Sequence, residues 1–307
     1  MTTLYITHPD CHRHEMGSWH PECPERLDAI ADHLLATGVL ACLVEREAPE
    51  ARAADIERVH APAYVQRLQN ALPATGYHPL DPDTLMNPHS LQAARRAAGA
   101  AVAAVDAVMA GEADTAFCAV RPPGHHAEPA TAMGFCFFNN VAIAARHALA
   151  EHGLQRIAIV DFDVHHGNGT EAAFAGDERV LMCSFFQHPF YPFRGTVNPA
   201  ANMVNVPVAA YAEGAAIRQL VQAQWLPRLN AHRPQLVLVS AGFDAHREDD
   251  MGQLGLVEAD YAWLTEQVMQ VAREHAQGRV VSCLEGGYNL SALARSVAAH
   301  VRVMAGL

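Results

Sequence analysis

Short apolar runs alternate along the chain with longer stretches in which apolar residues recur at helical spacing. Each short run is apolar at consecutive positions, which is typical of parallel strands that are buried on both faces. Five runs are therefore predicted as strands: residues 116–120, 156–161, 180–185, 236–241 and 280–284. Four longer stretches are predicted as helices: residues 90–110, 138–153, 213–230 and 258–277.

The alternation of strands and helices predicts an α/β fold, with a parallel sheet covered by helices on both faces. Two Pro-rich segments, 78–88 and 188–199, interrupt the pattern. We expect them to be surface loops that frame a cleft, because the strand–helix pattern resumes directly after each. The 307 residues are therefore predicted to form a single domain, 1–307.

The charge balance narrows the possible partners and chemistry. The chain has 21 basic and 33 acidic residues, a net charge of −12, which disfavours binding to nucleic acid or to an anionic membrane. All the basic residues are Arg, so chemistry that requires a lysine is excluded. The 19 His are numerous for this length, and His is the commonest metal ligand and general base.

The seven Cys form no C-x-x-C pair, which argues against a disulfide framework and favours a reducing compartment. The N-terminus does not resemble a signal peptide, and no apolar run reaches about 18 residues. These features predict a soluble, cytoplasmic protein. A homo-oligomer is compatible with the sequence.

Polar residues follow four of the predicted strands, and ligands of open α/β sheets bind at this carboxyl edge. These segments are Arg121-Pro-Pro-Gly-His-His126, Asp161-Phe-Asp-Val-His-His-Gly-Asn168, Ala241-Gly-Phe-Asp244 and Glu285-Gly-Gly-Tyr288. Asp163 and His165 are two residues apart at a strand end, so their side chains point the same way. With Asp244 they could bind Zn²⁺, Fe²⁺ or Co²⁺. Alternatively, they cap a helix and end a strand.

Adjacent imidazoles after a stiff Pro-Pro-Gly turn suggest that His125 and His126 are acid–base groups. Asp161 and Asn168 could each hold one of the two rings, and Tyr288 could donate to an oxyanion. The structural alternatives are a pair of loop histidines and a surface tyrosine. No G-x-S-x-G or G-x-G-x-x-G motif occurs, which disfavours a serine hydrolase and dinucleotide binding.

Five ordered motifs resemble the zinc-dependent histone deacetylase family. They are Arg121-Pro-Pro-Gly-His-His-Ala127, Gly134-Phe-Cys-Phe-Phe-Asn-Asn-Val141, Asp161-Phe-Asp-Val-His-His-Gly-Asn-Gly-Thr170, Ser240-Ala-Gly-Phe-Asp244 and Leu284-Glu-Gly-Gly-Tyr-Asn-Leu290. The last motif and His20-Pro-Glu-Cys-Pro-Glu-Arg26 resemble the class II branch, which includes bacterial histone deacetylase-like amidohydrolases. The resemblance extends from about His8 to Ala299.

This resemblance implies the arginase/deacetylase fold, with a central eight-stranded parallel sheet. It implies one Zn²⁺ per chain, bound by Asp163, His165 and Asp244. His126 would be the general base and then the general acid, and His125 its electrostatic partner. Asp161 would orient His125, Asn168 would support His126, and Tyr288 would polarise the acyl carbonyl.

The resemblance also implies a substrate tunnel and structural K⁺ sites. Tunnel or substrate-binding positions would be Gly134, Phe135, Tyr191, Met251 and Gly286; Tyr191 departs from the Phe usual in the family. One K⁺ would use Asp161, Asp163, His165, Ser184 and Phe185, and a second would use Phe174, Asp177, Val180 and Asn202.

The implied reaction is hydrolysis of an acyl-amide, such as acetyl-lysine in a peptide or protein, to an amine and a carboxylate. Met251 stands where polyamine-specific relatives have an acidic gatekeeper, which favours acyl-lysine over an acetylpolyamine. A small shift in the loop alignment would bring Glu248, Asp249 or Asp250 to the rim, so an acetylpolyamine amidohydrolase stays an alternative function. Two further alternatives are a non-catalytic acyl-ligand binder and a two-Mn²⁺ ureohydrolase. A ureohydrolase would need carboxylates for its second Mn²⁺, and this sequence has Gly167 and Gly242 at those positions.

Overall fold

A sheet of eight parallel strands forms the centre of the molecule in the computed structural model, which describes residues 1–307. The spatial order is β2-β1-β5-β10-β9-β6-β7-β8. The strands are β1 (Thr3–Thr7), β2 (Val44–Glu47), β5 (Thr115–Cys118), β6 (Ile157–Asp161), β7 (Val180–Gln187), β8 (Met203–Val208), β9 (Leu236–Ala241) and β10 (Val280–Leu284). The sheet expected from the sequence is confirmed.

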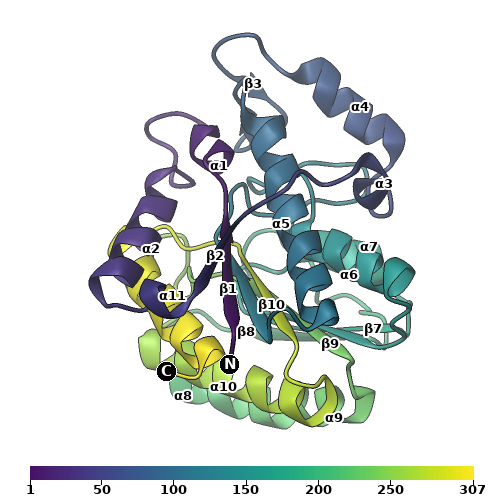
Figure 1. The fold of residues 1–307 in the computed structure, drawn as a ribbon, viewed down its shortest axis with the longest axis vertical. Helices are drawn as coiled ribbons and strands as arrows, with labels where there is room; N and C mark the ends of the chain where they lie inside the picture. Colours follow the sequence, from purple (N-terminus) through teal and green to yellow (C-terminus); the bar gives the residue numbers. More distant parts are fainter.

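Helices cover both faces of the sheet, as Figure 1 shows. On one face α11 packs against α2 and α10, and on the other α5 packs against α6. The helices are α1 (Asp10–Arg13), α2 (Glu25–Ala36), α3 (Ala53–Ile56), α4 (Pro62–Ala71), α5 (Ser90–Ala110), α6 (Asn140–Glu151), α7 (Asn168–Phe174), α8 (Gly214–Leu220), α9 (Leu226–His232), α10 (Glu258–His275) and α11 (Leu290–Ala305). None of them combines the length and apolarity needed to cross a bilayer.

The burial of the central strands accounts for the apolar runs from which they were predicted. Every residue of β5, β6, β9 and β10 is buried, so these strands are apolar at nearly every position. The edge strand β2 is exposed throughout, and three of its four residues, Val-Glu-Arg-Glu, are charged, so it has no continuous apolar pattern. Strand β8 carries Pro207, which an edge strand tolerates because it lacks one neighbour.

The stretch 213–230 differs from the single helix that its sequence predicts. A π-helical turn, Val221–Trp225, separates α8 from α9. Pro227 lies in the first turn of α9 and has no N–H to donate to the preceding turn, which accounts for the break in the α-helical bonding. The first Pro-rich segment, 78–88, is also more ordered than a plain loop, because β3 (His78–Pro79) pairs with β4 (Leu85–Met86).

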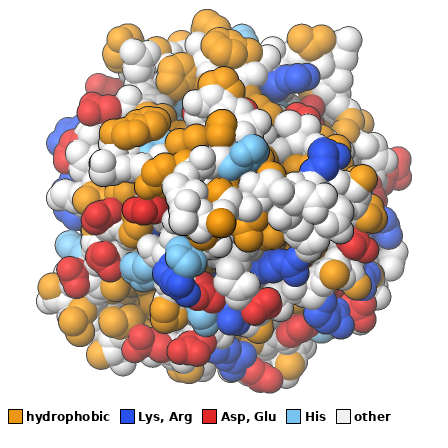
Figure 2. Space-filling view, turned by 90° about the horizontal axis from the view of Figure 1, so that it is seen from above, with side chains coloured by type: hydrophobic (Ala, Val, Ile, Leu, Met, Phe, Trp, Pro, Cys, Tyr) orange, Lys and Arg blue, Asp and Glu red, His pale blue; other side chains and the backbone are white.

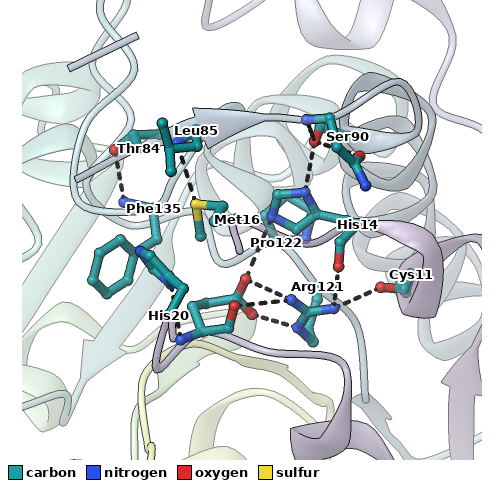
Figure 3. A network of polar contacts seen from close by, with 12 residues as sticks. Cys11, His14, Met16, His20, Thr84, Leu85, Ser90, Arg121, Pro122 and Phe135 are labelled. Atoms are coloured by element: carbon teal, nitrogen blue, oxygen red, sulfur yellow. Dashed lines mark hydrogen bonds and ion pairs between the residues drawn. The ribbon is translucent and has the colours of Figure 1, made fainter. Parts of the chain in front are cut away.

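A buried ion-pair network fixes the N-terminal segment to the carboxyl edge of the sheet. Arg121, three residues after β5, donates to the carbonyl oxygens of Cys11 at 2.8 Å and His14 at 3.0 Å, as Figure 3 shows. Its guanidinium also pairs with both oxygens of Glu22, one of them at 2.7 Å. Arg26 donates to Glu22 at 3.1 Å and to the carbonyl oxygen of Gly287 at 2.6 Å.

Glu22 is fully buried between these two guanidinium groups. Burial alone would raise its pKa, but the charge of Arg121, the contact with His14 and the charge of Arg26 together outweigh burial and hold the pKa well below its usual value. A carboxylate with a depressed pKa stabilises the fold above its unfolded-state pKa of about 4.3, and this contribution is lost as the pH falls.

Glu22→Ala is expected to lower the free energy of unfolding by about 3–5 kcal/mol, because it leaves two buried guanidinium groups without their carboxylate. Denaturant unfolding at pH 7 measures this change. The matched control is Glu112→Ala, which removes the exposed Arg46–Glu112 pair and is expected to cost at most about 1 kcal/mol. Equal losses of stability in the two variants would contradict the role of Glu22 as the buried partner of two guanidinium groups.

Candidate active site

Four neighbouring strands, β5, β10, β9 and β6, bring the predicted site residues to one edge of the sheet. Asp163 and His165 follow β6, and Asp244 follows β9. One ligand atom from each of the three lies within 4.8 Å of the others, and all three side chains are buried. His165 Nδ1 is 3.0 Å from Asp163 Oδ1 and 3.2 Å from Asp244 Oδ2.

The surroundings of the three side chains fit a metal ion. Backbone N–H groups occupy the outer carboxylate oxygens, since Gly286 donates to Asp163 Oδ2 at 2.9 Å and Val164 to Asp244 Oδ1 at 2.8 Å. Asp244 Oδ2 is buried without a hydrogen-bond partner. One imidazole and two carboxylates form a ligand set suited to a divalent metal with an open position.

The electrostatics of the group also favour a cation. Burial and the nearby charge of Asp163 raise the pKa of Asp244 to about 7. Burial disfavours a charged His165, but the adjacent carboxylates of Asp163 and Asp244 raise its pKa to about 10. A positive charge beside the two carboxylates is therefore favourable, and a bound metal ion would supply it in place of the imidazole proton.

Each ring of the histidine pair has its own acceptor. His125 Nδ1 lies 3.0 Å from Asp161 Oδ2, His126 Nδ1 lies 2.8 Å from Asn168 Oδ1, and the ring centroids are 4.0 Å apart. Burial opposes a charge on His125, but Asp163 and Asp161 raise its pKa well above the usual value. Burial and the charges of His125 and His165 lower the pKa of His126 well below it.

Glu128 determines which nitrogen of His126 carries the proton. The Asn168 amide group donates to Glu128 Oε1 at 2.9 Å, so the Asn168 oxygen faces His126. A carboxylate only accepts, and this orientation therefore requires His126 Nδ1 to donate. Nε2 of the neutral ring is then left as a proton acceptor. Glu128 was not identified from the sequence, although it lies two residues after His126 and directly follows the motif that ends at Ala127.

Glu285 is a second residue that sequence reasoning missed, although it lies inside the motif that contains Tyr288. Its Oε2 accepts hydrogen bonds from the backbone of Gly124 at 2.6 Å and His125 at 3.1 Å. Ser240, at the end of β9, donates to its other oxygen at 3.1 Å. The buried side chain thus connects three strand ends and fixes the turn that presents the histidine pair.

The Tyr288 loop is held from both sides. Asp249 Oδ2 accepts from the backbone N–H groups of Tyr288 at 2.6 Å and Asn289 at 2.9 Å. On the other side, the Arg26 guanidinium lies 5.0 Å from the centre of the Tyr288 ring. The loop also requires Gly286, because an added Cβ would lie 2.1 Å from Asp244 Oδ2.

A cavity of about 250 Å³ leads to this group of side chains. Its lining residues are Asp83, His126, Gly134, Phe135, His165, Phe190, Tyr191, Asp250, Met251 and Tyr288. Of the five expected tunnel positions, Gly134, Phe135, Tyr191 and Met251 lie in this lining. Gly286 lies behind it, where its N–H meets Asp163. Phe190 and Asp83 were not foreseen, whereas Asp250 is one of the three carboxylates that the sequence places near Met251.

Aromatic rings form the walls of the cavity. The Phe135 and Tyr288 rings meet edge to face at 5.8 Å, the Tyr191 ring is 5.2 Å from the His126 ring, and Phe190 stacks on His165 at 5.5 Å. Gly134 is needed beside them, because it has a φ of +54° and an added Cβ would lie 2.4 Å from the His126 ring. The face seen in Figure 2 mixes hydrophobic side chains with charged groups of both signs.

The residues of the expected K⁺ sites also come together. The carbonyl oxygens of Phe174, Asp177 and Val180 all accept from the Asn202 side-chain amide, at 2.8, 3.1 and 2.8 Å. In the other set, Asp161 is paired with Ser184 across β6 and β7, and the Ser184 hydroxyl contacts the Phe185 carbonyl at 3.4 Å. Potassium binding at either place stays a prediction.

The model of the histone deacetylase domain matches residues 20–304. The chain belongs to the histone deacetylase family. This histone deacetylase-family chain is 40% identical over 277 residues to the histone deacetylase-like amidohydrolase of Pseudomonas aeruginosa, which covers 88% of this chain and 73% of that protein. Over 342 residues it is 39% identical to human polyamine deacetylase HDAC10, covering 100% of this chain and 48% of that protein.

A solved structure supports the fold in the same way. The crystal structure of the HDA15 HD domain superposes with a TM-score of 0.93 at 33% identity, covering 100% of this chain and 90% of that one. The arginase/deacetylase fold expected from the motifs is therefore confirmed. The relatives named deacetylase or amidohydrolase support assignment of the chain to the hydrolases.

Asp244→Ala is expected to remove bound metal from the purified protein, because it leaves two of the three ligands. Elemental analysis of protein purified without added metal should find about one zinc per wild-type chain and much less in the variant. Asp250→Ala, a change at the cavity wall, should keep the wild-type metal content. Equal zinc in wild type and Asp244→Ala would exclude Asp244 as a ligand.

Proposed function

We propose that residues 1–307 form one deacetylase domain, which hydrolyses acyl-amides of the acetyl-lysine type to a free amine and a carboxylate. The observation that carries this proposal is the aromatic-walled cavity, which reaches His126, His165 and Tyr288 together. A narrow apolar passage suits an alkyl chain, and the groups at its end suit attack on a carbonyl.

Asp163, His165 and Asp244 would hold one Zn²⁺. When bound, the ion supplies Lewis acidity, which polarises a carbonyl group and makes water more acidic. The family relationship and the fit of the three side chains support zinc as the ion. The K⁺ sites around Asp161, Ser184 and Phe185 and around Asn202 would be structural.

His126 is the proton carrier of this proposal. Its Nδ1–H is engaged by Asn168, so Nε2 accepts a proton from the attacking water and later returns it to the leaving amine. The Asp161–His125 pair keeps a positive charge next to this ring. That charge keeps His126 neutral before the reaction and makes its protonated form a stronger acid afterwards.

Tyr288 supplies a hydroxyl donor to the developing oxyanion. Its ring lines the cavity together with His126 and His165, and its backbone is fixed by Asp249. A donor that is held in position before the reaction needs no reorganisation when negative charge develops on the carbonyl oxygen.

A polyamine deacetylase is the second candidate, and two carboxylates in the cavity lining favour it. Asp83 and Asp250 lie there beside the apolar Met251. Burial and the nearby Asp81 raise the pKa of Asp83 to about 6, so this carboxylate is mostly charged at pH 7 and attracts cations. Acetyl-lysine stays our first choice, because Met251 gives the wall an apolar residue where a polyamine would favour a third carboxylate.

Tyr288→Phe should lower kcat by about 10²–10³-fold with little change in KM, because the removed hydroxyl acts mainly in the transition state. Steady-state kinetics on an acetyl-lysine peptide measures this change. Zinc content serves as the control and should be unaltered. A variant with wild-type kcat would exclude Tyr288 as the oxyanion donor.

His126→Ala should reduce turnover by about 10²–10⁴-fold while the protein retains its metal. The same kinetic assay tests this, with elemental analysis of each preparation. A non-catalytic acyl-ligand binder would instead show no turnover in the wild type. If the variant kept near-normal kcat, another group would have to be the base.

Asp250→Asn separates the two substrate classes. If the chain prefers acetylpolyamines, losing this carboxylate should lower kcat/KM for an acetylpolyamine by about ten-fold and leave a neutral acetyl-lysine peptide nearly unaffected. If acetyl-lysine peptides are the substrates, the wild type should already prefer the peptide. Paired kcat/KM measurements on the two compounds decide between them.

A further inference from the structure

A second group of metal-binding side chains lies away from the active-site cavity, where α5 and α6 pack side by side (Figure 1). Asp106 comes from α5, His147 from α6, and His152 is the residue at the C-terminal end of α6. Asp106 Oδ1 lies 2.8 Å from His147 Nε2 and 2.7 Å from His152 Nε2. None of the three lines the cavity.

The contacts of His147 require a positive charge in this group. Its Nδ1 lies 3.0 Å from Asp55 Oδ1, and its Nε2 faces Asp106. A neutral imidazole has one N–H, and carboxylates only accept, so a neutral ring would place one lone pair against a carboxylate oxygen. Either a second proton or a metal ion must lie between Nε2 and Asp106.

Asp55 is built to hold the His147 ring in a metal-binding orientation. Its carboxylate is buried and accepts two hydrogen bonds from Arg52, at 2.6 and 3.0 Å. A histidine ligand commonly donates its other N–H to a carboxylate in this way, which fixes the ring and makes the ligating nitrogen more basic. Arg58, the other nearby cation, is already paired with Glu151 and Asp55.

The exposure of the group suits an ion that enters from solvent. The His147 side chain is 4% exposed, whereas His152 is 24% and Asp106 54% exposed. The buried ring is thus held rigidly, and the two outer ligands can adjust to an arriving ion. Two imidazoles and one carboxylate leave a coordination position for water, which is a ligand set typical of Zn²⁺.

We propose that Asp106, His147 and His152 bind a divalent transition-metal ion of the Zn²⁺ type that links α5 to α6. The ion takes the place of the proton between His147 Nε2 and Asp106. Because it binds the folded protein and joins two helices that cover one face of the sheet, it stabilises the fold. This site is independent of the ion at Asp163, His165 and Asp244.

The test is a zinc titration of the protein as purified, followed by isothermal calorimetry and by thermal unfolding. The wild type should bind one further Zn²⁺ and unfold at a higher temperature with it. Loss of a residue that only hydrogen-bonds to a metal ligand costs up to roughly 100-fold in metal affinity. His152→Ala and Asp106→Asn each change a ligand itself, so each should weaken Zn²⁺ binding by more than that. Deacetylase activity should be unchanged in both variants.

Two control variants show whether the further Zn²⁺ binds at Asp106, His147 and His152. His78→Ala removes an exposed histidine outside the group and should keep the further Zn²⁺. Asp244→Ala should also keep it, although that variant loses the active-site ion. Equal affinity and equal thermal stabilisation in wild type, His152→Ala and Asp106→Asn would overturn the proposal. Their circular dichroism spectra show whether each variant is folded.

Discussion

The burial of carboxylates at one edge of a sheet is the constraint on which this structure depends. Asp161, Asp163, Asp244 and Glu285 are all inaccessible to water, and each would be costly to bury alone. Their compensation comes from the strand-end loops, through the N–H groups of Gly286, Val164, Gly124 and His125 and through the two imidazoles at His125 and His165. The loops that satisfy these charges are the same loops that carry the reactive side chains.

The same constraint is met a second time behind the site. Glu22 compensates two buried guanidinium groups, and those groups bind carbonyl oxygens of the N-terminal segment and of the Tyr288 loop. The first residues of the chain are thus tied to the ends of β5 and β10. Because an unpaired buried charge is so unfavourable, segments far apart in sequence are held in one arrangement.

Much of this could be predicted from the sequence, because buried parallel strands leave a continuous apolar pattern and their ends leave polar motifs. Asp163, His165 and Asp244 were grouped on that basis, and the structure brings them together. Edge strands such as β2 gave no signal, since their residues face solvent. Glu128, Glu285 and Asp249 were missed as supporting residues, because their hydrogen-bond partners lie in other segments and only the folded chain shows them.

Asp249 links the cavity wall to the tyrosine loop within one short segment. Its carboxylate supports the backbone of Tyr288, and the next two residues, Asp250 and Met251, lie in the cavity wall. A backbone shift that reshapes the wall would therefore also move the support of the tyrosine. Selection for a new substrate in this scaffold would act on recognition and reactivity together, so changes in the wall that preserve the position of Asp249 are the ones an evolving lineage could accumulate freely.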